Sequence, residues 1–141
     1  MRRRGFTLVE LLTVLAVLGV LASVSLIKAR QYRERALRVT MMADLKTLVS
    51  AQEGFLSHSR DYAGGATPGD EVPGTGGRGR ASFRPSGTTQ VTIRYRSIRG
   101  WSATATNPSL QIRPNQCGIF IGQASYSPNR AVTSEGVPAC W

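Results

Sequence analysis

An uninterrupted apolar run over residues 6–27, FTLVELLTVLAVLGVLASVSLI, constrains this chain more than any other feature. As an α-helix the run would be ~33 Å long, which matches the ~30 Å hydrocarbon thickness of a bilayer. Its one formal charge is the carboxylate of Glu10. An unpaired carboxylate at membrane depth costs about 2.5–3.5 kcal/mol. The run therefore predicts a membrane-spanning helix in which Glu10 has a partner.

Basic residues stand on both sides of the apolar run. Arginines at positions 2–4 precede it, and it is followed by Lys28, Arg30, Arg33, Arg35 and Arg38. Because both flanks are positive, the usual excess of basic residues on the cytoplasmic side does not orient the helix. A secretory signal peptide cleaved within residues 22–25 is an alternative interpretation. It gives no reason for a carboxylate near the start of the run, so we favour the spanning helix.

The sequence MRRRG followed by FTLVELL resembles the leader and amino-terminal signature of type IV pilins and pseudopilins, which carry class III signal sequences. The resemblance implies that a prepilin peptidase removes residues 1–5 by cleaving between Gly5 and Phe6. It also implies that the new amino group of Phe6 is methylated and that Glu10 is needed for assembly. The signature covers residues 2–28, and a family-like continuation as one long helix extends it to about residue 58.

Elementary electrostatics supplies a mechanism for Glu10. Cleavage after Gly5 would place an ammonium group on Phe6, four residues from the carboxylate and about one helical turn away. In a low dielectric a paired carboxylate costs far less than an unpaired one, so Glu10 is expected to pair with its own terminus or with that of a neighbouring subunit. Pairing between subunits would set their axial stagger. The alternative is that Glu10 only complements the positive end of the helix dipole.

Gly19 lies in the middle of the hydrophobic segment, residues 6–28, and has two open interpretations. It is a candidate point for local melting or bending of the helix in a filament, or it permits a close contact between helices. Many pilins carry a proline near the end of this segment, whereas this chain reads Ser25-Leu26-Ile27-Lys28 there. Without a proline, Gly19 is the candidate for helix melting.

Residues 29–62 are expected to form the amphipathic helix of a head, because Gly54 is the one helix breaker before residue 58. At 100° per residue, one broad face gathers apolar side chains and is predicted to pack on a core: Leu37, Met41, Leu45, Leu48, Val49, Phe55 and Leu56. A stripe of mostly small residues lies nearly opposite: Tyr32, Ala36, Val39, Ala43 and Ser50. This stripe would let another helix approach closely, or it is a chance exposure of small residues.

Residues 63–88 are rich in Gly, Pro, Ser and Thr and predict a long connecting loop. Such a loop is expected to form the most variable surface of the head. Its glycines follow no strand and open no helix, so they do not form a nucleotide-binding fingerprint.

Three segments after the loop have strand patterns. Val91, Ile93 and Tyr95 alternate with polar or basic residues within 88–99, which predicts a strand with one apolar face. Gly100 interrupts this pattern and residues 101–106 alternate again, which predicts a hairpin, and residues 117–122 supply a third strand. An antiparallel sheet of three or four strands within 89–141, laid across the amphipathic helix, would bury both apolar faces. We therefore expect an α+β, pilin-like fold.

Cys117 and Cys140 are the two cysteines of the chain. In an exported domain they are expected to form one disulfide that closes the carboxy-terminal loop. Together with the single histidine, His58, they lack the spacing of a zinc site, so no metal and no cofactor are expected. No nucleophile, base and orienting group occur together, and we expect no enzymatic activity.

The chain of 141 residues has a formal net charge of +10, with sixteen arginines and two lysines against eight acidic residues. This balance favours acidic partners. The candidate nucleic-acid contacts are arginines of the head: Arg78, Arg80, Arg94, Arg96 and Arg99. Tyr95 and Trp101 would either stack on bases or belong to the core. A solvated basic surface is the alternative interpretation.

The resemblance implies a structural subunit of a type IV pilus that serves adhesion, twitching motility or DNA uptake. The subunit would be a precursor in the bacterial inner membrane and then part of an extracellular filament on the cell surface. Its implied partners are further copies of itself, the prepilin peptidase, an inner-membrane assembly platform with its ATPase motor, and the membrane before assembly.

Two alternatives share the same amino-terminal half. One is a pseudopilin of a type II secretion system, and the other is a minor competence pilin whose partner is DNA. Major pseudopilins often have a calcium site near the carboxy terminus, where residues 134–136 offer only the carboxylate of Glu135. This favours the pilus subunit.

Overall fold

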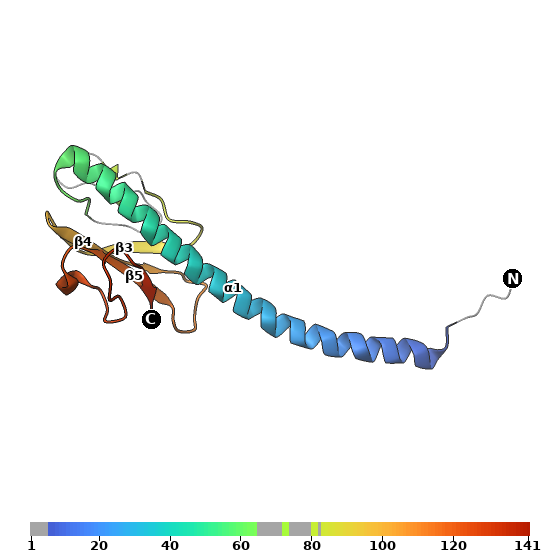
Figure 1. Ribbon diagram of the computed structural model, residues 1–141. Helices are drawn as coiled ribbons and strands as arrows, with labels where there is room; N and C mark the ends of the chain where they lie inside the picture. Colours follow the sequence, from blue (N-terminus) through green and yellow to red (C-terminus); the bar gives the residue numbers. More distant parts are fainter. Residues whose placement is uncertain (1–5, 65–71, 74–79, 82) are drawn as a thin grey trace. The chain divides into compact units, whose positions relative to one another are not determined.

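Figure 1 shows a computed structural model of the chain, which describes residues 6–64, 72–73, 80–81 and 83–141. Side chains are described for these residues except at 24–27 and in the two-residue strands 72–73 and 80–81. The chain divides into two units, Met1–Arg35 and Ala36–Trp141. The first contains the apolar segment, and the second is the head, with its own core.

A single helix, α1, begins at Leu8 and ends at Ser59. No proline occurs in this stretch, and glycines cost only about 1 kcal/mol each in a helix interior. Gly19 lies in unbroken helix, and a Cβ atom there would meet nothing within 4 Å. The expected long helix is confirmed. By length and composition, α1 is able to cross a membrane.

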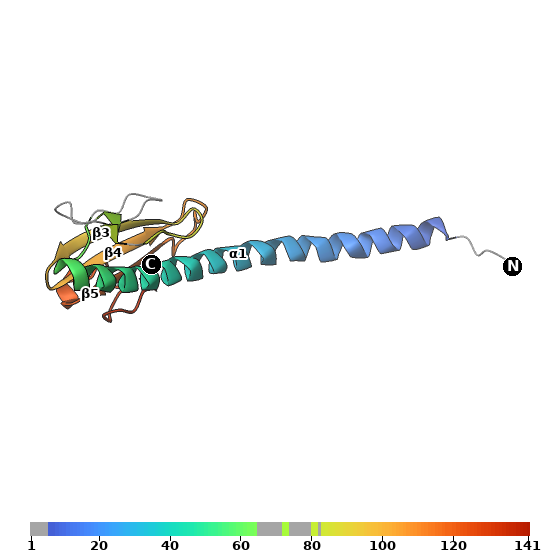
Figure 2. The ribbon, with the colours of Figure 1, turned by 90° about the horizontal axis from the view of Figure 1, so that it is seen from above.

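The head contains a four-stranded antiparallel sheet with the order β3-β4-β5-β6. Its strands are β3 (Gln90–Ser97), β4 (Gly100–Thr106), β5 (Gln116–Ile121) and β6 (Ala139–Cys140). Figures 1 and 2 both show the head part of α1 lying across β3, β4 and β5. The α+β, pilin-like class expected from the sequence is therefore confirmed.

Two smaller elements complete the head. The strands β1 (Val72–Pro73) and β2 (Arg80–Ala81) pair with each other inside the segment expected to be a loop. A short 3₁₀ helix, η2 (Ala124–Tyr126), follows β5. Residues 65–71, 74–79 and 82 lie outside the described part of the chain.

The predicted hairpin is present between β3 and β4. Ser97 pairs with Gly100, which leaves Ile98 and Arg99 as a two-residue turn. Gly100 has a φ of 153°, and a Cβ atom there would collide with the carbonyl oxygen of Ile121 on β5. Glycine is therefore required at this position, because only a residue without a side chain allows the neighbouring backbone to approach so closely.

A β-bulge in β3 changes which side chains face the helix. Ile93 pairs with Ala103, but after the bulge Tyr95 pairs with Ser102. An extra residue in one strand reverses the side toward which all later side chains point. Tyr95 therefore lies on the opposite face from Ile93 and is 42% exposed. The predicted apolar face of Val91, Ile93 and Tyr95 is wrong at Tyr95, because strict alternation does not allow for a bulge.

The main core lies between α1 and one face of the sheet. Its fully buried members from α1 and β4 are Met41, Leu45, Leu48, Trp101, Ala103 and Ala105. The α1 members are spaced three and four residues apart, and the β4 members two apart, as the two periodicities require. This confirms the predicted packing face of the helix. The remaining members of that face, Leu37, Val49, Phe55 and Leu56, are half-buried.

The other face of the sheet is covered by the carboxy-terminal segment. Ser102 of β4 and Phe120 of β5 pair on this face, and both are buried. Gly118 lies on the same face, where a Cβ atom would come within 2.7 Å of Cγ of Pro128 and 2.9 Å of the Trp141 ring. The last residues of the chain are thus packed directly on the β5 backbone.

Two buried polar side chains of α1 hold the segment that leads from the helix to the sheet. Gln52 donates a hydrogen bond to the carbonyl oxygen of Ala63 (2.9 Å) and accepts one from its backbone nitrogen (2.8 Å). Asp44 accepts hydrogen bonds from the backbone nitrogen (3.0 Å) and hydroxyl (2.7 Å) of Ser86. Burying a polar group is costly unless it is hydrogen-bonded. These pairs therefore hold Ala63, just after the helix, and Ser86, just before the sheet, against α1.

Candidate functional site

Thr7 caps the amino-terminal end of α1. Its Oγ1 atom accepts a hydrogen bond from the backbone nitrogen of Glu10 (3.3 Å), and its carbonyl oxygen accepts one from the nitrogen of Leu11 (3.2 Å). An N-cap of this kind stabilises a helix by about 1 kcal/mol. This capping role of Thr7 was not predicted from the sequence, although Thr7 followed three residues later by Glu10 is the pattern of a capping box.

Glu10 lies in the first turn of α1 and is exposed, as is Phe6. The positive end of the helix dipole favours a carboxylate at this position. The predicted cleavage site follows Gly5, which lies outside the described residues. Phe6 and Thr7 precede the helix, so the structure places the expected new terminus directly before the turn that carries Glu10.

The first part of α1 is apolar on every side. The exposed fraction exceeds one half for each of its large apolar side chains: Leu8, Val9, Leu11, Leu12, Val14, Leu15, Val17, Leu18, Val20 and Leu21. A helix that packs on one partner shows a single apolar stripe, whereas one that is apolar all round is suited to lipid or to the centre of a helix bundle. This surface is the strongest functional feature of the chain.

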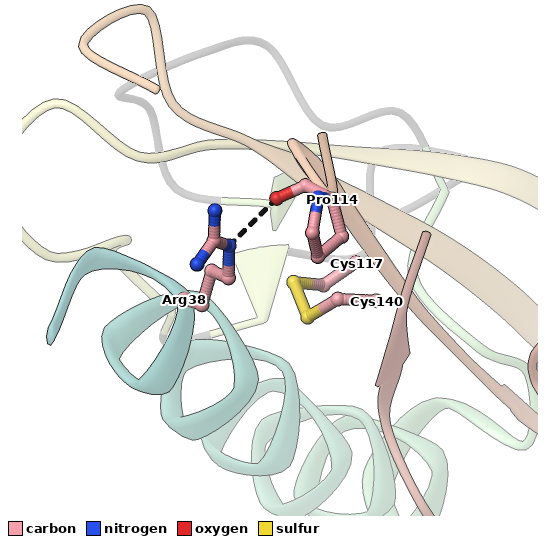
Figure 3. The surroundings of a disulfide bond; sticks show 4 residues. All are labelled: Arg38, Pro114, Cys117 and Cys140. Carbon is pink, nitrogen blue, oxygen red and sulfur yellow. Dashed lines mark hydrogen bonds between the residues drawn. A yellow bond between two sulfur atoms is a disulfide. The ribbon is translucent and has the colours of Figure 1, made fainter. Parts of the chain in front are cut away.

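The disulfide expected between Cys117 and Cys140 is present and joins β5 to β6. Beside it, Nε of Arg38 on α1 donates a hydrogen bond to the carbonyl oxygen of Pro114 (2.8 Å), as Figure 3 shows. The backbone nitrogen of Trp141 donates to the carbonyl oxygen of Gln116 (2.9 Å). The end of the chain is therefore tied to β5 by a covalent bond and by backbone hydrogen bonds.

The five arginines proposed as nucleic-acid contacts are in different situations. Arg78 and the side chain of Arg80 lie outside the described part of the structure. Arg94 and Arg99 are exposed, at the bulge and in the hairpin turn. Arg96 instead points inward, where Nη1 lies 3.0 Å from Oδ2 of Asp61 and 3.1 Å from the carbonyl oxygen of Tyr62. The bulge places Arg96 on the helix side, so it braces the end of α1.

The two aromatic residues considered for base stacking also differ. Trp101 is 0% exposed and belongs to the core, so it offers no surface for a base. Tyr95 stacks on Tyr126 of η2 with a distance of 4.3 Å between ring centroids. Of the two, only Tyr95 is available to a ligand.

Tyr62 lies where the chain leaves α1 and is almost completely buried. Burial, together with the nearby carboxylate of Glu53, raises the pKa of Tyr62 to about 12. Its hydroxyl donates a hydrogen bond to Oε1 of Glu53 (3.2 Å). The neutral phenol is therefore the form that the folded head stabilises.

Among the described residues, no group of three or more His, Cys, Asp or Glu side chains is placed to hold a metal ion. Nδ1 of His58 lies 2.9 Å from the hydroxyl of Ser57 and 3.0 Å from the carbonyl oxygen of Gly54. Glu135 accepts a hydrogen bond from the backbone nitrogen of Gly122 (2.6 Å). His58 and Glu135, the two side chains considered for metal binding, therefore both make hydrogen bonds to nearby groups of the protein.

Comparison with known proteins places the amino-terminal signature in a family. The family model described as the prokaryotic N-terminal methylation motif matches residues 1–26. The type IV major pilin protein PilA of Myxococcus xanthus (strain DK1622) is 34% identical over 77 residues, which are 55% of this chain and 35% of that protein. The amino-terminal part of the chain is therefore similar to type IV pilins. The residues predicted to act in processing and assembly, Gly5, Phe6 and Glu10, all lie within the matched motif.

A second relative extends the similarity beyond the hydrophobic segment. A fimbrial protein of Pseudomonas aeruginosa is 26% identical over 91 residues, which are 64% of this chain and 59% of that protein. The matches therefore span about a third and three fifths of the lengths of these two relatives. No solved structure matches this chain.

Proposed function

We propose that the chain is a structural subunit of a type IV pilus. In this proposal it is made as a precursor in the bacterial inner membrane and cleaved by a prepilin peptidase between Gly5 and Phe6. Phe6 is then methylated, and the subunit joins a helical filament on the cell surface with the help of a membrane platform and its ATPase motor. Its role is structural rather than catalytic, and the filament serves adhesion, twitching motility or DNA uptake.

The observation that carries this proposal is the surface of the first part of α1. Large apolar side chains are exposed on all of its sides, and one carboxylate lies in its first turn. Lipid covers such a surface before assembly, and like helices cover it in a filament. Replacing lipid by the same helices of neighbouring subunits changes the buried apolar area little. The geometry of the filament therefore has to be specified by packing and by polar pairs.

Glu10 is the polar group that supplies this specificity. After cleavage, the ammonium group of Phe6 on an incoming or neighbouring subunit neutralises the carboxylate in a low dielectric. A missing partner would leave a buried charge, so subunits in the wrong axial register are disfavoured. The carboxylate thus selects the stagger of the filament.

The experiment compares three versions of the chain in cells that assemble pili. Glu10→Gln removes the charge and keeps the shape of the side chain, whereas Thr7→Ala removes the N-cap and keeps the charge. Sheared filaments are examined by electron microscopy, and the amino terminus of each protein is determined by mass analysis. We expect the native chain and Thr7→Ala to form filaments that begin at methylated Phe6. We expect Glu10→Gln to be processed but to form no filaments.

The outcomes separate the alternatives. Loss of filaments in Thr7→Ala and not in Glu10→Gln would mean that the first turn matters only as a helix start. Processed protein without filaments in any version would indicate a pseudopilin of a type II secretion system or a minor pilin. An amino terminus at Met1 or near Ser25 would refute the proposal.

A minor pilin that binds DNA is the second candidate. The hairpin carries the observation in its favour, because Arg94, Tyr95 and Arg99 are all exposed on it. Each phosphate contact contributes about −0.9 to the slope of log affinity against log salt for duplex DNA. Replacing Arg94 and Arg99 by glutamine should reduce this slope by about 2, whereas the same change at Arg113 and Arg130 should leave it unaltered.

A further inference from the structure

A group of basic side chains follows the apolar part of α1 directly. Lys28, Arg30, Arg33 and Arg35 are all exposed and belong to the same unit as the apolar segment. Glu34 is the single acidic residue among positions 28–35, so this stretch has a formal net charge of +3, four basic residues minus one acidic residue. Tyr32, between them, is 65% exposed.

The four basic residues surround the helix instead of forming one stripe. At 100° per residue, Arg30 lies ~200°, Arg33 ~140° and Arg35 ~340° around the axis from Lys28. Two charges therefore point to one side and two to the opposite side. A protein partner that docks on one helix face would meet only half of them, whereas a lipid headgroup layer surrounds the helix and meets all four.

The length of the apolar run places these charges at headgroup depth. Residues 6–27 span ~33 Å as a helix and the hydrocarbon core is ~30 Å thick, so Lys28 follows where the hydrocarbon ends. Positions 28–35 extend ~10 Å further along the helix axis, and a headgroup layer is ~5–8 Å thick. Because arginine side chains reach several ångströms along the axis, all four charged groups can lie within this layer. An exposed tyrosine within the group fits the same depth, because tyrosine is enriched at membrane interfaces.

Processing would make this group the dominant charged anchor of the subunit. Cleavage after Gly5 removes the three arginines at positions 2–4 and leaves the ammonium group of Phe6 as the one positive charge at that end of the segment. The basic residues at the other end of the segment remain.

We propose that Lys28, Arg30, Arg33 and Arg35 form a collar that binds the anionic headgroups of phospholipids in the leaflet next to the head. This inference rests on the proposed insertion of the subunit in the membrane before assembly. The collar also fixes the depth of the helix. Glu10 lies eighteen residues before Lys28, or ~27 Å along the axis, and is thereby held inside the hydrocarbon until a partner neutralises it.

The test measures lipid selectivity of the full chain in bilayers. The protein is reconstituted in phosphatidylcholine with a small fraction of either spin-labelled phosphatidylglycerol or spin-labelled phosphatidylcholine. Electron paramagnetic resonance then gives the share of each label that is immobilised at the protein. All proteins carry glutamine at positions 2–4, so that the leader does not attract lipid.

Two fourfold variants with the same change of charge are compared. The collar variant combines Lys28→Gln, Arg30→Gln, Arg33→Gln and Arg35→Gln. The control replaces four exposed arginines of the head by glutamine: Arg60, Arg84, Arg113 and Arg130. A basic residue near an anionic surface contributes about 1 kcal/mol, which corresponds to about a fivefold preference for the anionic label at each contacted site.

We expect this preference in the parent and the head control, and its loss in the collar variant and in about 1 M salt, which screens exposed charges. Equal immobilisation of both labels in the parent, or an unchanged preference in the collar variant, would overturn the collar. If neither label is immobilised by any protein, the helix is not inserted, and the proposed function fails as well.

Discussion

The hydrogen bonds between Gln52 and Ala63 predict a large loss of stability when Gln52 is replaced by leucine. Both residues are 0% exposed, so water does not replace the lost bonds. Leucine has a similar volume, and the change leaves the backbone nitrogen and carbonyl oxygen of Ala63 without partners. Each buried unsatisfied group costs about 1–3 kcal/mol. Two such groups cost about 2–6 kcal/mol, and burial of the apolar leucine side chain offsets about 2 kcal/mol of the larger values, so we expect the free energy of unfolding of the head to fall by about 2–4 kcal/mol.

The assay is guanidinium unfolding of the full chain in detergent micelles, followed by the fluorescence of buried Trp101. A loss of this size should also lower the melting temperature by about 10–20 °C for a domain of about a hundred residues. Gln111→Leu is the matched control, because Gln111 is exposed in the same unit and should change stability by less than about 0.5 kcal/mol.

A second variant, Gln52→Glu, tests the same pair of hydrogen bonds. In Gln52→Glu an ionised side chain still accepts from the nitrogen of Ala63 but donates nothing to its carbonyl oxygen, and it adds a buried charge. It should be at least as unstable as Gln52→Leu at neutral pH. If both variants unfold within 0.5 kcal/mol of the parent, the reasoning about this buried pair is refuted.

Three further predictions concern the head. Replacing Cys117 and Cys140 by serine opens a loop with a sequence separation of 23. The free energy of unfolding measured in guanidinium should fall by about 3 kcal/mol, and a much smaller loss would contradict the role of the disulfide in closing this loop. Tyr62, whose pKa is raised to about 12, should ionise with a midpoint near pH 12 in a titration followed at 295 nm. Its contribution to stability is complete below pH 10 and is lost as the pH rises from 10 to 12, and Tyr62→Phe should remove that dependence. Gly118→Ala should destabilise the head by about 1–3 kcal/mol through overpacking. Gly54→Ala should instead stabilise α1 by about 0.5–1 kcal/mol, because a Cβ atom at position 54 would meet nothing within 4 Å. If both substitutions changed the free energy of unfolding in the same direction, this difference in contacts at the two glycines would be contradicted.

Local patterns in the sequence predicted much of the fold. The periodicity of Met41, Leu45 and Leu48 identified the buried face of the helix, because side chains three and four residues apart share a face. Gly100 identified the hairpin. The cysteine pair was predicted from the exported character of the head and is present as a disulfide.

Polar interactions between distant residues were not predicted. Gln52 and Asp44 look like ordinary polar helix residues, yet both are buried because Ala63 and Ser86 supply their partners. Arg96 seemed to be an exposed basic residue of a strand. The bulge between Ile93 and Tyr95 turns it toward Asp61, and nothing in the alternation of the strand announces that bulge.

The amino-terminal signature around Gly5, Phe6 and Glu10 and the length of the apolar run are evident without a structure. These features depend only on neighbouring residues and on the thickness of a bilayer. The burial of individual polar residues and the exposure of individual arginines of the head emerge only from the folded structure. A hydrogen bond or an ion pair between distant segments depends on strand register, and one extra residue in β3 reverses the side toward which every later side chain points.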